Sequence, residues 1–388
     1  MRGLSRNFYL FLGFHSFLLG LFPFFLPVYL FKNGASLAEI SWFIALTGVG
    51  FNLTLWLLDH ARKGSCLIPV LISFFLEACL LILLLSGVSL PLVALANGSY
   101  SCLFWTIQRV LFLAGGTSKD SGRRFGNFQI YVLIVLKAGV FVGSLLLENI
   151  GVGTVCLLSL VVGIAGMAVF WRYGRELQFP IAMQNQSPLS LRNVIGFSDR
   201  NNSRLVFAID GIFLYLESYF WLITLFLVVG ESFVRLGVLV IALAIILGLI
   251  FYLIKNRIDR IAGQKVYVIA VILYMVSWGL RGTLSEVADL TLQLCLLLAV
   301  AFSTSLFRLA FNKRFFDLAL RGTLYQYLFI KSYLSQLFMA VGFGLIGWWT
   351  AGGGAVSAVL NSCYWFAGFA AGLYLLYRPV GKGGKASG

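Results

Sequence analysis

Residues 7–31 read NFYLFLGFHSFLLGLFPFFLPVYLF, an apolar stretch without a single Asp, Glu, Lys or Arg side chain. A helix rises 1.5 Å per residue, so about 20 apolar residues cross the hydrocarbon core of a bilayer. The stretch is longer than the apolar core of a signal peptide, which has roughly 7–15 residues. We therefore interpret it as a retained membrane-spanning helix.

Further apolar runs of similar length follow along the chain. They lie at 38–58, 65–87, 89–114, 127–149, 151–172, 204–230, 234–256, 264–281, 288–311, 322–348 and 353–377. Several junctions are short, and a count of eleven would put the two termini on opposite sides of the membrane. The runs predict an all-α integral membrane protein of twelve transmembrane helices in two six-helix bundles.

Composition supports the same class of protein. Of the 388 residues, 60% are hydrophobic and only 11% are charged, whereas soluble domains carry about a quarter charged residues. The six cysteines form no Cys-x-x-Cys pair and the chain has two histidines, so neither a zinc site nor a disulfide framework is indicated. We expect no metal and no cofactor.

One polar stretch, from Arg172 to Arg204, divides the apolar runs six and six. The sequence thus predicts an N-terminal bundle at 1–172, a cytoplasmic linker at 173–203, a C-terminal bundle at 204–377 and a disordered tail at 378–388. No loop is long enough for a soluble catalytic domain.

The net charge of +15 is explained by topology. With a cytoplasmic N-terminus, most basic residues lie inside, and only Lys32, Arg235 and Arg281 lie outside, as the positive-inside rule requires. We expect a multi-pass protein of the inner (plasma) membrane with both termini in the cytoplasm. Nucleic-acid binding is not indicated.

The two halves of the chain repeat a pattern of intramembrane cations. Tyr131 in the fifth run and Tyr325 in the eleventh each precede a lysine by six residues, and the run before each carries one arginine. Internal repeats of this kind are typical of duplicated transporters. The four matched cations are Arg109, Lys137, Arg308 and Lys331.

Two loops in equivalent positions also match. The loop after the second run contains Asp59 and Lys63, and the loop after the eighth contains Asp259, Arg260 and Lys265. In this spacing the chain resembles a divergent member of the major facilitator superfamily, whose loop signature joins an acidic residue to basic residues and glycines. Neither copy keeps the leading glycine of that signature.

The resemblance implies a secondary transporter whose two bundles rock about a central site. It also implies that the five loop residues form a cytoplasmic gate, because a carboxylate at a helix end can bond helix termini and basic side chains. The alternative is that Asp59 and Asp259 only cap short turns.

Two carboxylates in the seventh run, Asp210 and Glu217, are candidates for proton coupling. Seven residues turn about 700°, so both face the same side of an α-helix. The resemblance places Arg109, Asp210, Glu217 and Arg308 on cavity-lining helices and Lys137 and Lys331 on flanking ones. Three aromatic side chains close to these charges could form an apolar wall: Trp105, Tyr215 and Trp221. We expect Glu77 to lie outside the site and His15 to be a packing residue.

These residues favour transport of a small anionic or amphipathic organic solute, coupled to protons by Asp210 or Glu217. The expected partners are that solute, membrane lipid and protons. Alternatively, the same charges form permanent salt bridges that only fix the helix packing. Efflux or flipping of lipid-like compounds and a non-transporting scaffold remain alternatives. A membrane-embedded enzyme would need paired carboxylates, a His-x4-Asp motif or metal ligands at one membrane face, and the sequence has none.

Overall fold

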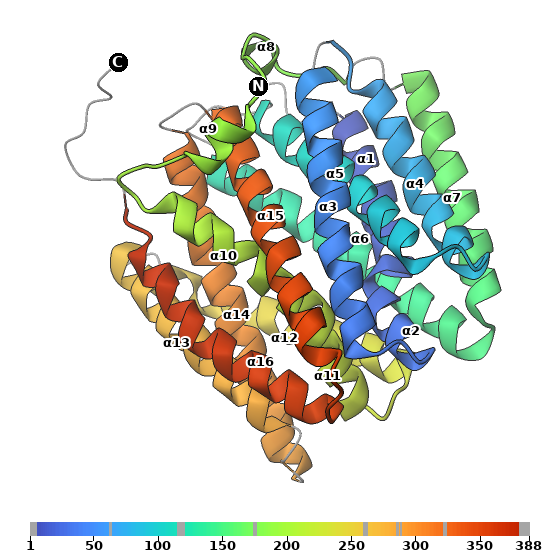
Figure 1. The fold of residues 1–388 in the computed structure, drawn as a ribbon, viewed down its shortest axis with the longest axis vertical. Coiled ribbons are helices and arrows are strands. Elements are labelled where there is room, and N and C mark those ends of the chain that lie inside the picture. Colours follow the sequence, from blue (N-terminus) through green and yellow to red (C-terminus); the bar gives the residue numbers. More distant parts are fainter. Residues whose placement is uncertain are drawn as a thin grey trace. The chain divides into compact units, whose positions relative to one another are not determined.

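The computed structural model describes residues 6–61, 64–114, 121–173, 177–258, 263–284, 287, 289–320 and 324–379. Within these residues, twelve helices are long and apolar enough to cross a membrane (Figure 1). They begin and end close to the predicted runs, so the all-α membrane architecture is confirmed. The chain divides into two compact units, which are described separately below.

The first unit comprises Met1–Ser190, Val229–Val238 and Met339–Gly347. In it, α1 packs against α6, α3 against α5, and α4 against both α5 and α7 (Figure 1). Its elements are α1 (Arg6–Leu21), η1 (Pro23–Phe25), α2 (Leu26–Lys32), α3 (Leu37–Ala61), α4 (Leu67–Leu85), α5 (Leu90–Ala114), α6 (Ser121–Asn149), α7 (Val152–Tyr173) and α8 (Ile181–Gln184).

The first predicted run is a broken span and not one continuous helix. Pro23 and Pro27 each lie in the first turn of a new element, η1 and α2. Proline lacks the backbone N–H group, which an α-helix needs everywhere except in its first turn. The span therefore restarts at each proline.

Glycines allow α1 and α6 to pack with their backbones in contact. A Cβ atom added at Gly139 would lie 2.3 Å from the Phe17 carbonyl oxygen, and one at Gly143 would lie 2.2 Å from the Leu21 oxygen. The Gly139–Gly143 spacing is the small-residue pattern that favours close helix packing in lipid.

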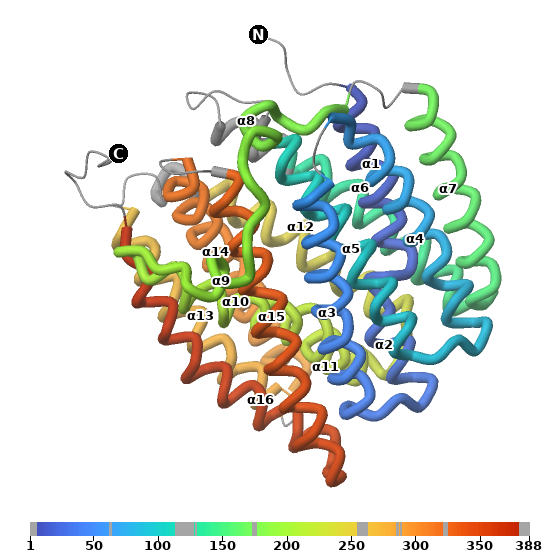
Figure 2. Tube along the Cα trace, turned by 45° about the horizontal axis from the view of Figure 1, so that its top comes forward, coloured from blue at the N-terminus to red at the C-terminus, as the bar shows by residue number. Residues whose placement is uncertain are grey.

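The second unit comprises Leu191–Val228, Leu239–Phe338 and Trp348–Gly388. Here α13 packs against α14, α16 and η5 (Figure 2). Its elements are α9 (Leu191–Ile195), α10 (Ser203–Tyr215), η3 (Leu216–Phe220), α11 (Trp221–Val228), α13 (Gly263–Thr283), α14 (Leu290–Ala319), α16 (Val356–Ala370) and η5 (Ala371–Leu376), with the larger parts of α12 (Phe233–Ile258) and α15 (Leu324–Thr350).

The polar stretch between the two sets of spans is hydrogen-bonded to the helices beside it. In the first unit, the Cys66 N–H donates to the Leu177 carbonyl at 2.8 Å. In the second, the Arg378 N–H donates to the Asn201 carbonyl at 3.0 Å, and the Asn201 side chain donates to the carbonyls of Arg378 and Pro379. The first two residues of the expected tail are thus held in place; residues 380–388 lie outside the described part of the chain.

Candidate functional site

Four charged side chains of the second unit form one buried ion-pair network. Arg308 on α14 is at its centre: Nη1 donates to Asp210 Oδ1 at 2.7 Å, and Nε donates to Glu217 Oε2 at 3.1 Å. Lys331 on α15 extends the network, with Nζ 3.1 Å from the other Asp210 oxygen. Two cations face two carboxylates, so the network has no net formal charge.

Two tyrosines complete the hydrogen bonding of the carboxylates. The Tyr274 hydroxyl on α13 donates to Glu217 Oε1, and the Tyr374 hydroxyl in η5 donates to Asp210 Oδ1 at 3.1 Å. Hydrogen bonds to an ionised group are stronger than those between neutral groups. Sequence reasoning missed both tyrosines, because the local pattern of neither segment shows which side chain meets Asp210 or Glu217.

Burial within the network is uneven. The Asp210 side chain is 1% exposed and that of Lys331 is 9% exposed, while those of Glu217 and Arg308 are 15% and 17% exposed. An unpaired charge in the middle of a membrane costs about 2.5–3.5 kcal/mol on insertion scales, and pairing offsets this cost. Asp210 is therefore the innermost member, and the Arg308–Glu217 pair forms the more accessible edge.

A change of helix type places Glu217. It lies in η3, a π-helical turn of five residues that separates α10 from α11 within one span. Such turns occur frequently at functional sites, because the wider turn changes the direction of the side chains that follow. Both Asp210 and Glu217 contact the same guanidinium group, so they face the same side of the span.

A glycine allows the lysine to reach its partner. A Cβ atom added at Gly211 would lie only 2.0 Å from the Ser335 carbonyl oxygen, so α10 and α15 are in backbone contact at this point. Asp210 adjoins the glycine, and Lys331 lies one helical turn before Ser335. The close approach thus brings the two charged side chains within ion-pair distance.

Arg281 is a buried cation that the sequence analysis placed outside the membrane. It lies on α13, is 1% exposed, and donates to the hydroxyl groups of Ser277 and Thr304. Its guanidinium group lies 4.0 Å from the ring centroid of Trp278 and 5.1 Å from that of Trp221. Arg281 ends the predicted run 264–281 and was expected outside the membrane, but α13 and its membrane-capable span continue to Thr283, so the residue lies within the helix. Among the described residues, no carboxylate forms an ion pair with Arg281.

The four cations of the sequence repeat divide evenly between the units. Arg308 and Lys331 are paired with carboxylates in the second unit. Arg109 on α5 and Lys137 on α6 belong to the first unit, and both are half-buried. Lys137 Nζ lies 5.6 Å from the centroid of the Phe24 ring, and no carboxylate of the described residues forms an ion pair with it. The two lysines of the repeat therefore match in sequence but differ in their contacts.

The three expected aromatic residues also divide between the units, and all are half-buried. In the second unit, Trp221 lies over Arg281 and Tyr215 stacks on Tyr219 with centroids 5.4 Å apart. In the first unit, the ring centroids of Trp105 and its chain neighbour Phe104 lie 4.8 Å apart. Trp221 is thus next to a cation, although a different one from those that the sequence suggested.

Two of the five expected gate residues lie in the described part of the chain. Asp59 is fully buried at the end of α3 and accepts a hydrogen bond of 2.7 Å from the Leu189 N–H. Lys265 is exposed in the first turn of α13. The other three, Lys63, Asp259 and Arg260, lie outside the described residues.

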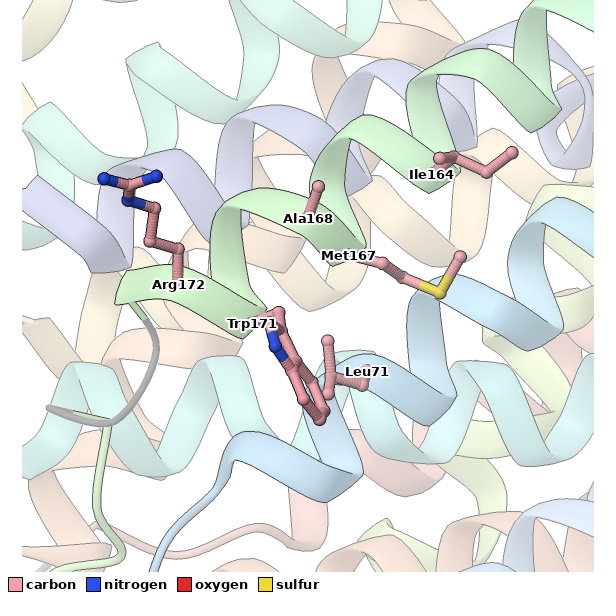
Figure 3. Close-up of a pocket in the computed structure, with 6 residues that line it drawn as sticks. All are labelled: Leu71, Ile164, Met167, Ala168, Trp171 and Arg172. Atoms are coloured by element: carbon pink, nitrogen blue, oxygen red, sulfur yellow. The ribbon is translucent and has the colours of Figure 1, made fainter.

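An open groove lies between α4 and α7 of the first unit, with a volume of about 860 Å³. Figure 3 shows Trp171 and Leu71 turned toward each other across it, whereas the Arg172 guanidinium group points away from them. The remaining lining residues are Ile164, Met167 and Ala168. The groove is apolar and contains none of the network residues.

No family model and no curated protein matches the chain. Many solved structures match its fold, and two of them cover nearly the full length of the chain. A crystal structure of a point mutant of the nucleoside transporter NupG has a TM-score of 0.67 at 15% identity, covering 97% of this chain and 98% of that one. A second NupG structure has a TM-score of 0.62 at 16% identity, with the same coverage. These matches show that the chain shares the all-helical fold of these structures over nearly its full length.

Proposed function

We propose that this chain is a secondary transporter that moves a small organic solute across the inner membrane by alternating access. The ion-pair network of Asp210, Glu217, Arg308 and Lys331 is the observation that carries the proposal. Charged residues inside membrane helices usually mark substrate or ion pathways. A twelve-helix fold shared with NupG supports transport as the activity.

The network suggests how a proton and an anionic substrate bind together. Each cation is held by a carboxylate, so neither is available to an anion in the state observed. Protonation of Asp210 would release Lys331 and one arm of Arg308, and protonation of Glu217 would release the other arm. A neutralised carboxyl group and a released cation together make room for one negative charge.

Arginine at the centre favours a carboxylate or phosphate on the solute. The guanidinium group offers a planar fork of donors that matches these groups in bidentate geometry. The more exposed Arg308–Glu217 edge is the side from which the solute would reach the network. We therefore place a small organic anion first among substrate classes.

A nucleoside is the second candidate, because both matched structures are nucleoside transporters. Nucleobases stack on aromatic side chains, and Trp221 with its neighbours in the second unit supplies such rings. A neutral nucleoside would use the network for hydrogen bonding, without displacing a carboxylate.

Uptake into proteoliposomes tests the proposal. The purified chain is reconstituted and supplied with a panel of labelled organic acids, phosphate esters and nucleosides, with and without an inward proton gradient. We expect saturable uptake of one anion class that increases with the gradient. Uptake of nucleosides alone would favour the second candidate. Failure of every solute, with flipping of a labelled lipid in the same vesicles, would overturn the proposal.

A further inference from the structure

His15 of α1 and Glu77 of α4 form a second buried pair, which lies in the first unit. The imidazole Nδ1 is hydrogen-bonded to Glu77 Oε2. Both side chains are almost completely buried, with 0% and 1% exposed. The pair is on other helices and in the other unit from the Arg308 network, so that network does not account for it.

The far side of the imidazole ring is also bonded. Its Nε2 lies 2.9 Å from Ser73 Oγ, and the same hydroxyl group lies 2.7 Å from the Val70 carbonyl oxygen. The ring of Phe74 stacks on the imidazole with centroids 3.9 Å apart and an interplanar angle of 15°. Both ring nitrogens therefore have fixed partners, and stacking limits rotation of the ring.

Counting hydrogens gives two states for this arrangement. A serine hydroxyl has one hydrogen, and a neutral imidazole has one N–H. If Ser73 donates to Val70, its oxygen accepts from His15 Nε2–H; a second proton then lies between Nδ1 and Glu77, and the pair has no net charge. If Ser73 donates to Nε2, only the Nδ1–H remains to bond the carboxylate, and the pair has a charge of −1.

The two states differ by one proton and by rotation of one hydroxyl hydrogen. In both, the bonds from His15 to Glu77 and to Ser73 are kept. We propose that His15, Glu77 and Ser73 form a proton-binding site, which takes up and releases one proton during the transport cycle. The proposal rests on the proposed function, since it assigns part of the coupling to the first unit.

The burial of the His15–Glu77 pair links its protonation state to the conformation of the first unit. An isolated buried charge costs several kcal/mol even after relaxation, so the neutral state is the one compatible with the closed aromatic environment. Release requires water to reach the pair, and this requires α1 to separate from α4. Proton release would therefore occur only in the conformation that opens this part of the first unit.

Few other ionisable groups face the pair. Tyr100 on α5 lies beside the Glu77 carboxyl group. From α6, the Tyr131 hydroxyl donates to the Tyr9 carbonyl and lies against Gly13 of α1. From α7, the ring of Phe170 packs on Phe74. Within the described residues, no arginine or lysine forms an ion pair with Glu77, and the group bonded to its carboxylate is the His15 imidazole, which is charged only when protonated.

The test uses Glu77→Gln and Ser73→Ala in the full chain. Ser41→Ala is the matched control, because Ser41 is also fully buried but bonds only the carbonyl one turn earlier in its own helix. Proteoliposomes are assayed for solute accumulation driven by a proton gradient and for solute counterflow without a gradient. We expect Glu77→Gln to keep counterflow and to lose gradient-driven accumulation, Ser73→Ala to shift its pH dependence, and Ser41→Ala to behave as the original chain does.

Accumulation by Glu77→Gln equal to that of the original chain would overturn the proton site and leave the transport proposal standing. Infrared difference spectroscopy of the purified chain between acid and alkaline pH gives a second readout that needs no known solute. A carboxyl carbonyl band that is present in the original chain and lost in Glu77→Gln supports the site. A pH difference spectrum that is identical in the two proteins overturns it. If no solute is transported but the band is found, the proposed function fails and the proton site stands.

Discussion

The Lys331 ammonium group lies 3.1 Å from Asp210 Oδ2, at the point where α10 and α15 make backbone contact. The ion pair and the helix contact depend on each other. Because Gly211 has no side chain, the two helices approach closely enough for a lysine one turn from Ser335 to reach the carboxylate.

A methyl group at this contact should therefore destabilise the second unit. In Gly211→Ala the new Cβ would meet the Ser335 carbonyl oxygen at 2.0 Å, and overpacking of this kind costs about 1–3 kcal/mol. Gly248→Ala on α12 is the control, since nothing lies within 4 Å of its added Cβ. We expect thermal unfolding in detergent to shift downward for the first variant only. Equal midpoints for the two would contradict the close contact.

Removing one charge of the network should destabilise the folded protein more than removing two opposite charges that pair with each other. Asp210→Asn leaves Lys331 and Arg308 without a full counter-charge, and breaking a buried pair costs about 3–5 kcal/mol. Asp210→Asn combined with Lys331→Gln removes both partners and should regain most of the stability. If the network acts in transport, the double variant should still fail to accumulate solute. A double variant that is both stable and fully active would show that the network only supports packing.

Arginine at position 308 should not be replaceable by lysine. The Arg308 side chain donates from separate nitrogens to Asp210 and Glu217, and an ammonium group cannot reproduce this fork. We expect Arg308→Lys to raise the KM for solute uptake by about tenfold, equivalent to the loss of one good hydrogen bond of about 1.4 kcal/mol. Unchanged uptake kinetics would mean that a point charge is sufficient.

The buried Asp59 carboxylate offers a separate test of the gate. It accepts a hydrogen bond from the Leu189 N–H, so Asp59→Asn keeps an acceptor oxygen at this position while Asp59→Ala does not. If this bond holds the linker, Asn should retain more transport than Ala in the uptake assay. Equal losses in both variants would show that the charge matters and the bond does not.

The sequence predicted the spans well, because a bilayer demands long apolar runs whatever the helices contact. It also indicated that Asp210 and Glu217 share a face, since helical spacing within one run decides this. It did not show which distant helices meet. The tyrosine donors Tyr274 and Tyr374, and the pairing of His15 with Glu77 across 62 positions, depend on tertiary packing that periodicity does not contain.

Two further differences have local causes. Arg281 is the last residue of the apolar run 264–281 and was therefore expected outside the membrane, but α13 continues by another two residues and the guanidinium group is buried beside Trp278. The π-helical turn that contains Glu217 has no sequence signature of its own, because its residues are ordinary helix formers. Neither feature could be read from the apolar pattern alone.

Equilibrium binding of the transported solute to the purified chain tests the central claim most directly. Lys331→Gln removes one cation of the network and leaves the negative charge of Asp210 in place, whereas Lys313→Gln removes an exposed lysine of α14. The network account predicts that Lys331→Gln loses binding of the anionic solute and that Lys313→Gln binds as the original chain does. Unchanged binding by Lys331→Gln would contradict it.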